Sequence, residues 1–145
     1  MTLGNLNSDL RQWERALETY HQAAACYQAQ EDAYGEAQVL VNLGAAYRSL
    51  GRWGEAVRSC RRSLHTFLDV EDTLSAALAL GGLGDVLVEL GVYEEAVECY
   101  EASLDIFAEA GNVNGQVAML NNLGRTFDVL ENRSGRSICT IKAWN

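Results

Sequence analysis

A Leu-Gly pair returns every 40 residues, at Leu3-Gly4, Leu43-Gly44, Leu83-Gly84 and Leu123-Gly124. Other positions keep this spacing, and we call each set of residues 40 apart a column: Trp13, Trp53 and Tyr93; Ala16, Ala56 and Ala96; Ala23, Ser63 and Ser103; Tyr27, Phe67 and Phe107. A fixed period of this length is typical of one stacked structural unit. The sequence therefore predicts a repeat protein that presents an extended interaction surface.

Within each unit the apolar residues follow a helical period. They fall at i, i+3, i+7 and i+10 in two successive units, as Leu40, Leu43, Tyr47 and Leu50 and as Leu80, Leu83, Leu87 and Leu90. Breaks at Gly51 and Gly91 follow, and the chain has no proline to end a helix. The pattern predicts helices over residues 2–10, 12–29, 33–50, 53–69, 73–90, 93–109 and 113–130, so each unit has a first and a second helix.

Charge and hydropathy exclude several classes of function. The formal net charge of −9 disfavours binding to a nucleic-acid backbone, which needs a clustered positive excess. No apolar run approaches the ~20 residues that span a bilayer, and no secretory signal precedes the repeats, so membrane insertion is not expected. The cysteines show neither close pairs nor metal-ligand spacing, and we expect reduced thiols in a cytoplasmic protein without metal or cofactor: Cys26, Cys60, Cys99 and Cys139.

Catalysis is not expected from these residues. His21 and His65 lie on separate predicted helices in different columns, and neither belongs to a cluster of metal ligands. No serine or cysteine has the sequence context of an activated nucleophile. The sequence therefore predicts that the protein is not an enzyme.

The order of Leu-Gly, aromatic and alanine positions resembles the tetratricopeptide repeat. Two stretches carry the resemblance best, NLGAAYRSLGRWGEAVRSCRRSL from Asn42 and GLGDVLVELGVYEEAVECYEASL from Gly82. The 40-residue period is longer than usual, and it resembles the subclass found in cell-polarity adaptors that bind G-protein regulatory segments and in kinesin light chains. The resemblance implies an all-α fold, a right-handed α-solenoid of antiparallel helix pairs.

The resemblance covers residues 1–131, with units at about 1–32, 33–72 and 73–112 and a partial unit at 113–131. After Leu130 the pattern fails, since Arg133 stands where an aromatic residue is expected, and we expect a degenerate or partly disordered tail over 132–145. Both ends then lack a complete helix pair, which favours a part or isoform of a longer protein.

The resemblance also implies that first helices line a concave groove that binds a peptide of a partner protein. Framework columns barely change between units, whereas the columns facing this groove change freely. The groove residues we predict are Asn42, Ala45, Arg48, Gly82, Asp85, Glu89, Asn121, Asn122, Arg125 and Asp128. Leu78 and Gly82 occupy positions where relatives that bind chaperone C-termini carry basic residues, so that ligand is disfavoured.

Several alternatives stay open at the level of sequence. The leading hypothesis is a non-catalytic scaffold or adaptor, and the alternative is structural self-assembly, or a fragment without its own ligand, with weak association through uncapped ends. Arg125 serves either a ligand carboxylate or only Asp128, three residues on. Gly81 and Gly82 are either tolerated weak points of a helix or clear room for a ligand backbone.

Overall fold

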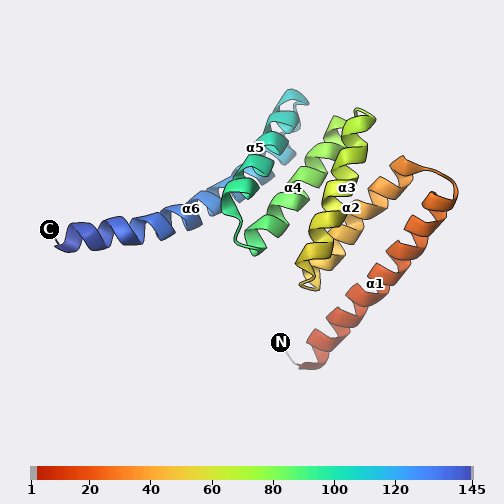
Figure 1. The fold of residues 1–145 in the computed structure, drawn as a ribbon, viewed down its shortest axis with the longest axis horizontal. Helices are drawn as coiled ribbons and strands as arrows, with labels where there is room; N and C mark the ends of the chain where they lie inside the picture. The colour runs from red at the N-terminus through yellow and green to blue at the C-terminus, as the bar shows by residue number, and fades with distance from the viewer. Residues whose placement is uncertain (1–2, 145) are drawn as a thin grey trace.

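The computed structural model describes residues 3–144, with side chains for residues 9–133. This part of the chain forms six α-helices and no strand: α1 Leu3–Ala29, α2 Ala33–Ser49, α3 Trp53–Asp69, α4 Thr73–Glu89, α5 Tyr93–Glu109 and α6 Val113–Trp144. Each helix packs against the next in a row of antiparallel helices, with α1 at one end and α6 at the other (Figure 1). The predicted all-α solenoid is confirmed. We refer to α2, α4 and α6 as first helices and to α3 and α5 as second helices.

Turns of one construction separate the helices. The N–H of Arg52 donates to the carbonyl of Tyr47 at 2.8 Å, and the corresponding bond at the end of α4 closes the same loop. The residue before the donor has a positive φ, 75° at Gly51 and 79° at Gly91. Glycine adopts this conformation without the steric penalty of a Cβ atom, which explains the repeated glycine column.

Each first helix begins with a side-chain cap. The capping oxygens accept a backbone N–H three residues later, at 2.9, 3.2 and 2.9 Å, and belong to Asp32, Asp72 and Asn112. The Tyr34 hydroxyl also donates to Asp72, at 2.6 Å. Hydrogen bonds from Tyr34 and then Ser75 lower the pKa of the Asp72 carboxyl.

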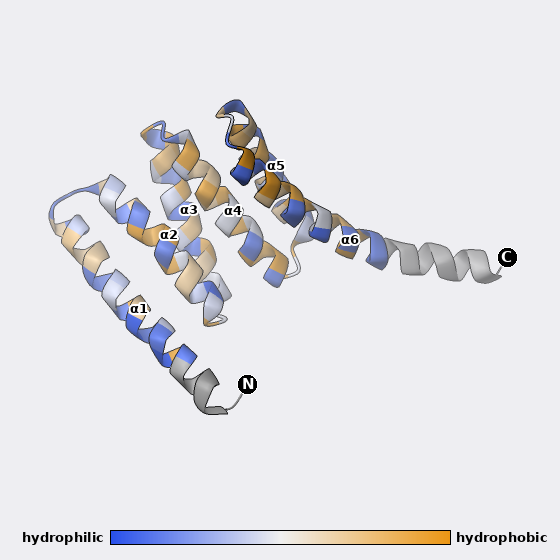
Figure 2. Cartoon of the chain, turned by 180° about the vertical axis from the view of Figure 1, so that it is seen from behind, coloured by the Kyte–Doolittle hydropathy of each residue, from blue (hydrophilic) through white to orange (hydrophobic). Residues whose placement is uncertain are grey.

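Small and aromatic residues of the repeated columns form the core, in which the buried members include Ala56, Phe67, Ala96 and Phe107. A Cβ atom built on Gly44 would lie 2.7 Å from the Cys60 Sγ, and one on Gly84 would lie 2.7 Å from the Tyr100 ring. Both distances are too short for a real contact, so these glycines allow the first and second helix of a unit to pack closely. Figure 2 shows the hydrophobic residues concentrated in the middle helices, α4 above all.

The helix ends differ from the prediction at both ends of the row. The helices predicted over 2–10 and 12–29 are one helix, α1, and the helix predicted to end near residue 130 continues to Trp144 in α6. Arg11 and Glu131 stand in the column of Gly51 and Gly91. Glutamate takes the left-handed position of the turns at Glu31 and Glu71, so the absence of glycine removes a preference for a turn but does not by itself make the helix continue. The predicted tail, 132–145, is helical as far as Trp144.

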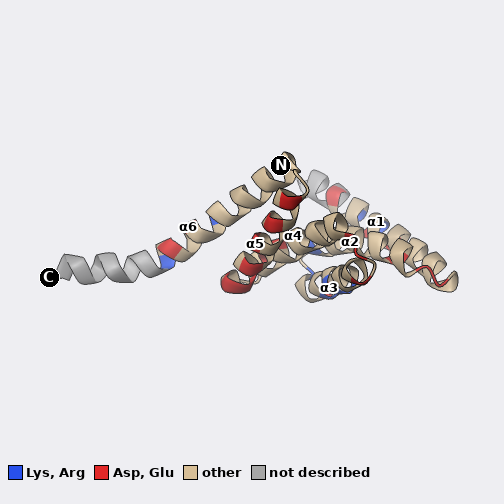
Figure 3. Cartoon of the chain, turned by 90° about the horizontal axis from the view of Figure 1, so that it is seen from above, with Lys and Arg blue, Asp and Glu red and all other residues tan. Residues whose placement is uncertain are grey.

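The basic residues around α3 are mostly paired within the chain. Ion pairs join Arg61 to Glu95 at 2.7 Å and Arg62 to Glu36 at 2.9 Å. Arg52 pairs with Glu55 three residues on, and its guanidinium also lies 5.0 Å from the centre of the Tyr47 ring. Acidic residues are distributed along the length of α5 (Figure 3). The pairs of Arg61 and Arg62 thus connect neighbouring helices. Because these ion pairs are exposed to solvent, each contributes little to stability.

Candidate functional site

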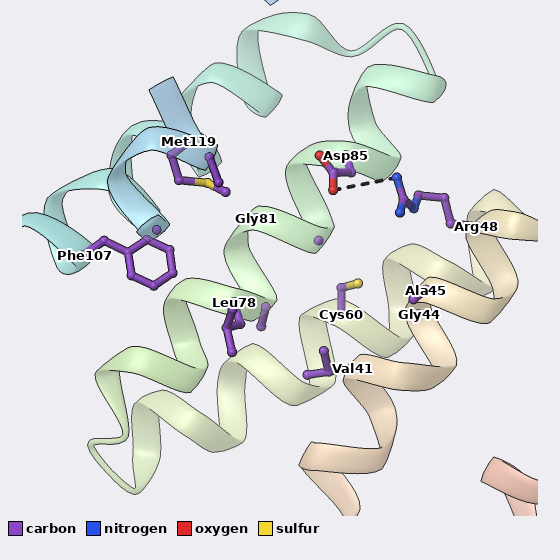
Figure 4. Close-up of a pocket in the computed structure, with 14 residues that line it drawn as sticks. Val41, Gly44, Ala45, Arg48, Cys60, Leu78, Gly81, Asp85, Phe107 and Met119 are labelled. Carbon is purple, nitrogen blue, oxygen red and sulfur yellow. Dashed lines mark ion pairs between the residues drawn. The ribbon is translucent and has the colours of Figure 1, made fainter. Parts of the chain in front are cut away.

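A hollow of about 320 Å³ lies on the face formed by the first helices (Figure 4). Val41 and Ala45 of α2 line it on one side, Leu78 of α4 in the middle, and Ala118 and Met119 of α6 on the other. These side chains are apolar, so the hollow suits an apolar group of a ligand. The hollow lies where three successive units meet, and no single unit could form it.

Two glycines on α4 shape this hollow in different ways. A Cβ atom on Gly82 would meet only the Cys60 Sγ, at 3.7 Å, which is an ordinary contact. A Cβ atom on Gly81 would lie 3.1 Å from the Met119 Cε, so that glycine is packed against α6. Gly81 therefore allows two first helices to approach, whereas the missing side chain at Gly82 deepens the hollow.

A charged pair borders the hollow. Arg48 Nη1 of α2 lies 3.7 Å from Asp85 Oδ2 of α4, and the Tyr100 hydroxyl donates to Asp85 Oδ1 at 2.6 Å. Burial, followed by this hydrogen bond to a carboxylate, raises the pKa of the Tyr100 phenol. Because Tyr100 belongs to the core and holds Asp85 from behind, the carboxylate keeps a fixed position at the edge of the hollow.

A second hollow of about 150 Å³ adjoins the first, and Arg48 and Asp85 line both. Its other polar lining residues are Glu89, Tyr100, Asn122, Arg125 and Thr126. Amide and guanidinium groups of this kind can bond a peptide backbone or a carboxylate. Together the two hollows form a continuous strip that is apolar at one end and polar at the other.

The structure brings most of the predicted groove residues to this strip. Those that line one or both hollows are Ala45, Arg48, Gly82, Asp85, Glu89, Asn122 and Arg125. The other three are exposed but line neither hollow: Asn42, Asn121 and Asp128. Among the described side chains Arg125 has no ion-pair partner within 4.0 Å, so the pairing with Asp128 considered above is not formed.

Sequence reasoning missed the floor of the first hollow, which includes Cys60, Phe107 and Met119. Phe107 belongs to the repeated aromatic column with Phe67, whereas Cys60 and Met119 stand in columns that the sequence analysis assigned neither to the framework nor to the groove. The close approach of helices that Gly81 allows was the available signal, because the side chain opposite a glycine becomes part of the floor. Burial raises the pKa of the Cys60 thiol to about 11.

A further hollow, of about 260 Å³, lies between α1, α2 and α3. His21 Nε2 lies 2.7 Å from the Tyr47 hydroxyl at its edge, so His21, to which the sequence gave no role, joins α1 to α2. Arg58 and the paired Arg62 line it as well, on the side away from the first-helix strip.

Within the residues described, no three histidine, cysteine or acidic side chains are grouped so that they could hold a metal ion. Free thiols are present at Cys26, Cys60 and Cys99, while the side chain of Cys139 lies outside the described part. None of the helices searched is both long enough and apolar enough to cross a membrane.

Comparison with protein families identifies a match. The family model described as tetratricopeptide repeat matches residues 1–66 and 75–136, which is most of the chain. The search of curated proteins found no significant match. The chain therefore belongs to the tetratricopeptide repeat family, whose members generally serve as protein-interaction modules.

Proposed function

We propose that the chain is a non-catalytic adaptor that binds an extended peptide segment of a partner protein along α2, α4 and α6. The observation that carries this proposal is the strip of two adjoining hollows, which three units share and which variable columns border. A surface that varies over a constant framework suits recognition of an irregular chain. Membership of the tetratricopeptide repeat family supports the same class of function.

The residues that line the two hollows indicate which chemical groups the ligand carries. An apolar side chain of the peptide occupies the first hollow between Leu78 and Ala118, over the space left by Gly82. A carboxylate or backbone carbonyl of the ligand lies in the second hollow, where Asn122 and Arg125 donate hydrogen bonds. A basic side chain of the ligand is favoured next to Glu89.

Other properties of the proposal follow from composition. The acidic chain is not a nucleic-acid binder, and its free thiols support a reducing, cytoplasmic setting. Peptide recognition needs no cofactor. The 40-residue period favours the subclass that the cell-polarity adaptors and kinesin light chains represent.

The experiment that tests the proposal fills the first hollow. Ala118 is an exposed alanine that lines the hollow, so Ala118→Trp blocks the hollow without disturbing the core. Ala102 is an exposed alanine on α5 that lines neither hollow, and Ala102→Trp is the matched control. Both variants and the wild type are immobilised after equal helicity has been verified, and proteins captured from a cell extract are compared.

We expect some proteins to be captured by the wild type and by the Ala102→Trp variant but not by the Ala118→Trp variant. A peptide scan of each lost partner then identifies the bound segment. Identical sets of captured proteins for all three chains would contradict recognition through this strip.

A further inference from the structure

The end helix α6 exposes a face that its counterpart α4 buries. Leu87 of α4 is 3% exposed beneath α5, whereas Phe127 in the same column of α6 is 47% exposed. Ala77 is fully buried, and its counterpart Val117 is 50% exposed. Gly84 contacts the Tyr100 ring, while a Cβ atom on Gly124 would meet nothing within 4 Å. In the described part of the chain, α6 therefore carries the binding face for a second helix and has none on it.

The opposite end of the row shows the converse. Residues 13–29 of α1 match the columns of the second helices α3 and α5, but α1 packs on α2 alone. Ala16, Tyr20 and Ala23 are consequently only half-buried. Their counterparts on both second helices are buried, namely Ala56, Cys60, Ser63, Ala96, Tyr100 and Ser103. Among the described residues, this segment of α1 therefore has the face of a second helix but packs against one first helix, α2.

We propose that α6 of one copy receives α1 of a second copy, in the register that α5 has on α4. In both complete pairs, one side chain of the second helix fills the space above a glycine of the first: Cys60 at Gly44 and Tyr100 at Gly84. The same register places Tyr20 of the second copy above the open Gly124. The aromatic ring there is of the same type as Tyr100.

Charge complementarity supports this occupant over other partners. Successive second helices are joined by the ion pair of Arg61 and Glu95, at 2.7 Å. One unit further along, these two columns hold Glu101 of α5 and Arg15 of the second copy. The signs are exchanged but remain opposite, so the same pair forms across the contact. Both residues are exposed and have no ion-pair partner among the described side chains.

The contact joins unlike surfaces, so it does not close on itself as a twofold dimer does. Figure 1 places α1 and α6 at opposite ends of the row. Each added copy therefore leaves one free α1 and one free α6, and the assembly grows head to tail. The average mass rises with concentration and does not stop at that of a dimer.

The first test fills the slot at Gly124. Since nothing lies within 4 Å of the added Cβ, Gly124→Trp folds as the wild type does but excludes the second copy. Gly54 of α3 is equally open, so Gly54→Trp is the matched control. Sedimentation velocity from about 10 µM to about 1 mM should show association of wild type and control, and a loss on the order of 100-fold for Gly124→Trp.

The second test exchanges the charges. Arg15→Glu and Glu101→Arg each place like charges across the contact and should weaken association by about 5-fold. A mixture of the two single variants restores opposite charges at every contact between unlike copies, so it should associate as the wild type does.

Three results would overturn the proposal. One is a wild type that stays monomeric over the whole range of concentration. Another is association that Gly124→Trp leaves unchanged. The last is a plateau at the dimer mass that Arg15→Glu does not affect, because that result indicates pairing of two α6 faces instead.

Discussion

Gly82 and Gly84 lie two residues apart on α4 and face opposite sides of it. The space next to Gly84 is filled by the ring of Tyr100, so a Cβ atom there would be 2.7 Å from a core aromatic. The space next to Gly82 is open except for a sulfur at 3.7 Å. The same residue type therefore serves packing on one side of the helix and leaves a hollow on the other.

This difference extends along all the first helices. Columns on the framework side repeat from unit to unit because each must fit the same neighbouring helix. Columns on the strip side change because they meet fewer residues of the chain, with Asp85 and Gly81 as the positions that do have close neighbours. If this difference is correct, substitutions on the framework side must lower stability, and substitutions on the strip side must change ligand binding.

The largest effect on stability is expected at Phe67, which is 1% exposed. Phe67→Ala should lower the free energy of unfolding by about 3–5 kcal/mol, because it removes a buried ring and leaves a cavity. Leu78→Ala on the strip, where the side chain is 59% exposed, should cost roughly 0.5 kcal/mol or less. Urea unfolding followed by circular dichroism measures both, and comparable losses would break the comparison.

A difference in reactivity of on the order of 100-fold is expected between two cysteines. Cys60 forms part of the strip's floor but is buried, and its thiol pKa is raised to about 11. Cys26 is exposed. Alkylation with iodoacetamide at neutral pH should modify Cys26 far faster, since the thiolate is the reactive form. Mass spectrometry of peptides gives the two rates. Equal rates would show that the Cys60 thiol is as accessible as that of Cys26 and is not buried in the floor of the hollow.

The two glycines should respond to alanine with opposite signs. Gly84→Ala forces the Tyr100 ring to move and should destabilise the fold by about 1–3 kcal/mol. Gly82→Ala meets no clash and should stabilise it by up to about 1 kcal/mol, because alanine favours a helix more than glycine does. Thermal unfolding of both variants provides the measurement. A loss of stability at Gly82 would mean that the hollow is not open.

The smallest effect is expected at a helix cap, which belongs to neither side. Asp72→Ala should cost about 1 kcal/mol, whereas Asp72→Asn keeps a capping oxygen, as Asn112 does in the next unit. Because folding lowers the pKa of Asp72, its carboxylate adds stability above the ordinary carboxyl pKa of about 4. That contribution disappears as the pH falls through the folded-state pKa.

Unfolding of the wild type and of Asp72→Asn should therefore be compared between about pH 7 and pH 3. The stability difference should shrink toward acid pH. A constant difference would show that the hydrogen bonds to the carboxylate contribute nothing beyond the cap.

The sequence predicted the stacked helices because the columns that repeat are those that pack. It missed the continuous α1 and α6, although Arg11 and Glu131 replace the turn glycine in both. The turn column is ambiguous at this point, because glutamate also ends a helix in the left-handed conformation at Glu31 and Glu71.

For the strip, the variable columns identified the rim, which includes Arg48 and Asp85. The floor could not be predicted from them, because Met119 reaches it from the neighbouring first helix, in a column of Val39, Ala79 and Met119 that had been assigned no role. The distance between neighbouring units decides which side-chain atoms are left exposed at the floor. The sequence pattern within one unit does not determine that distance.

The most direct test of the account is methyl NMR of the protein during titration with a segment of a captured partner. The methyl groups of Val41, Leu78 and Met119 line the first hollow, whereas Leu68 and Val92 are exposed away from it. We predict saturable shifts in the first set and none in the second. Shifts confined to Leu68 and Val92 would contradict the proposal that the ligand binds along α2, α4 and α6.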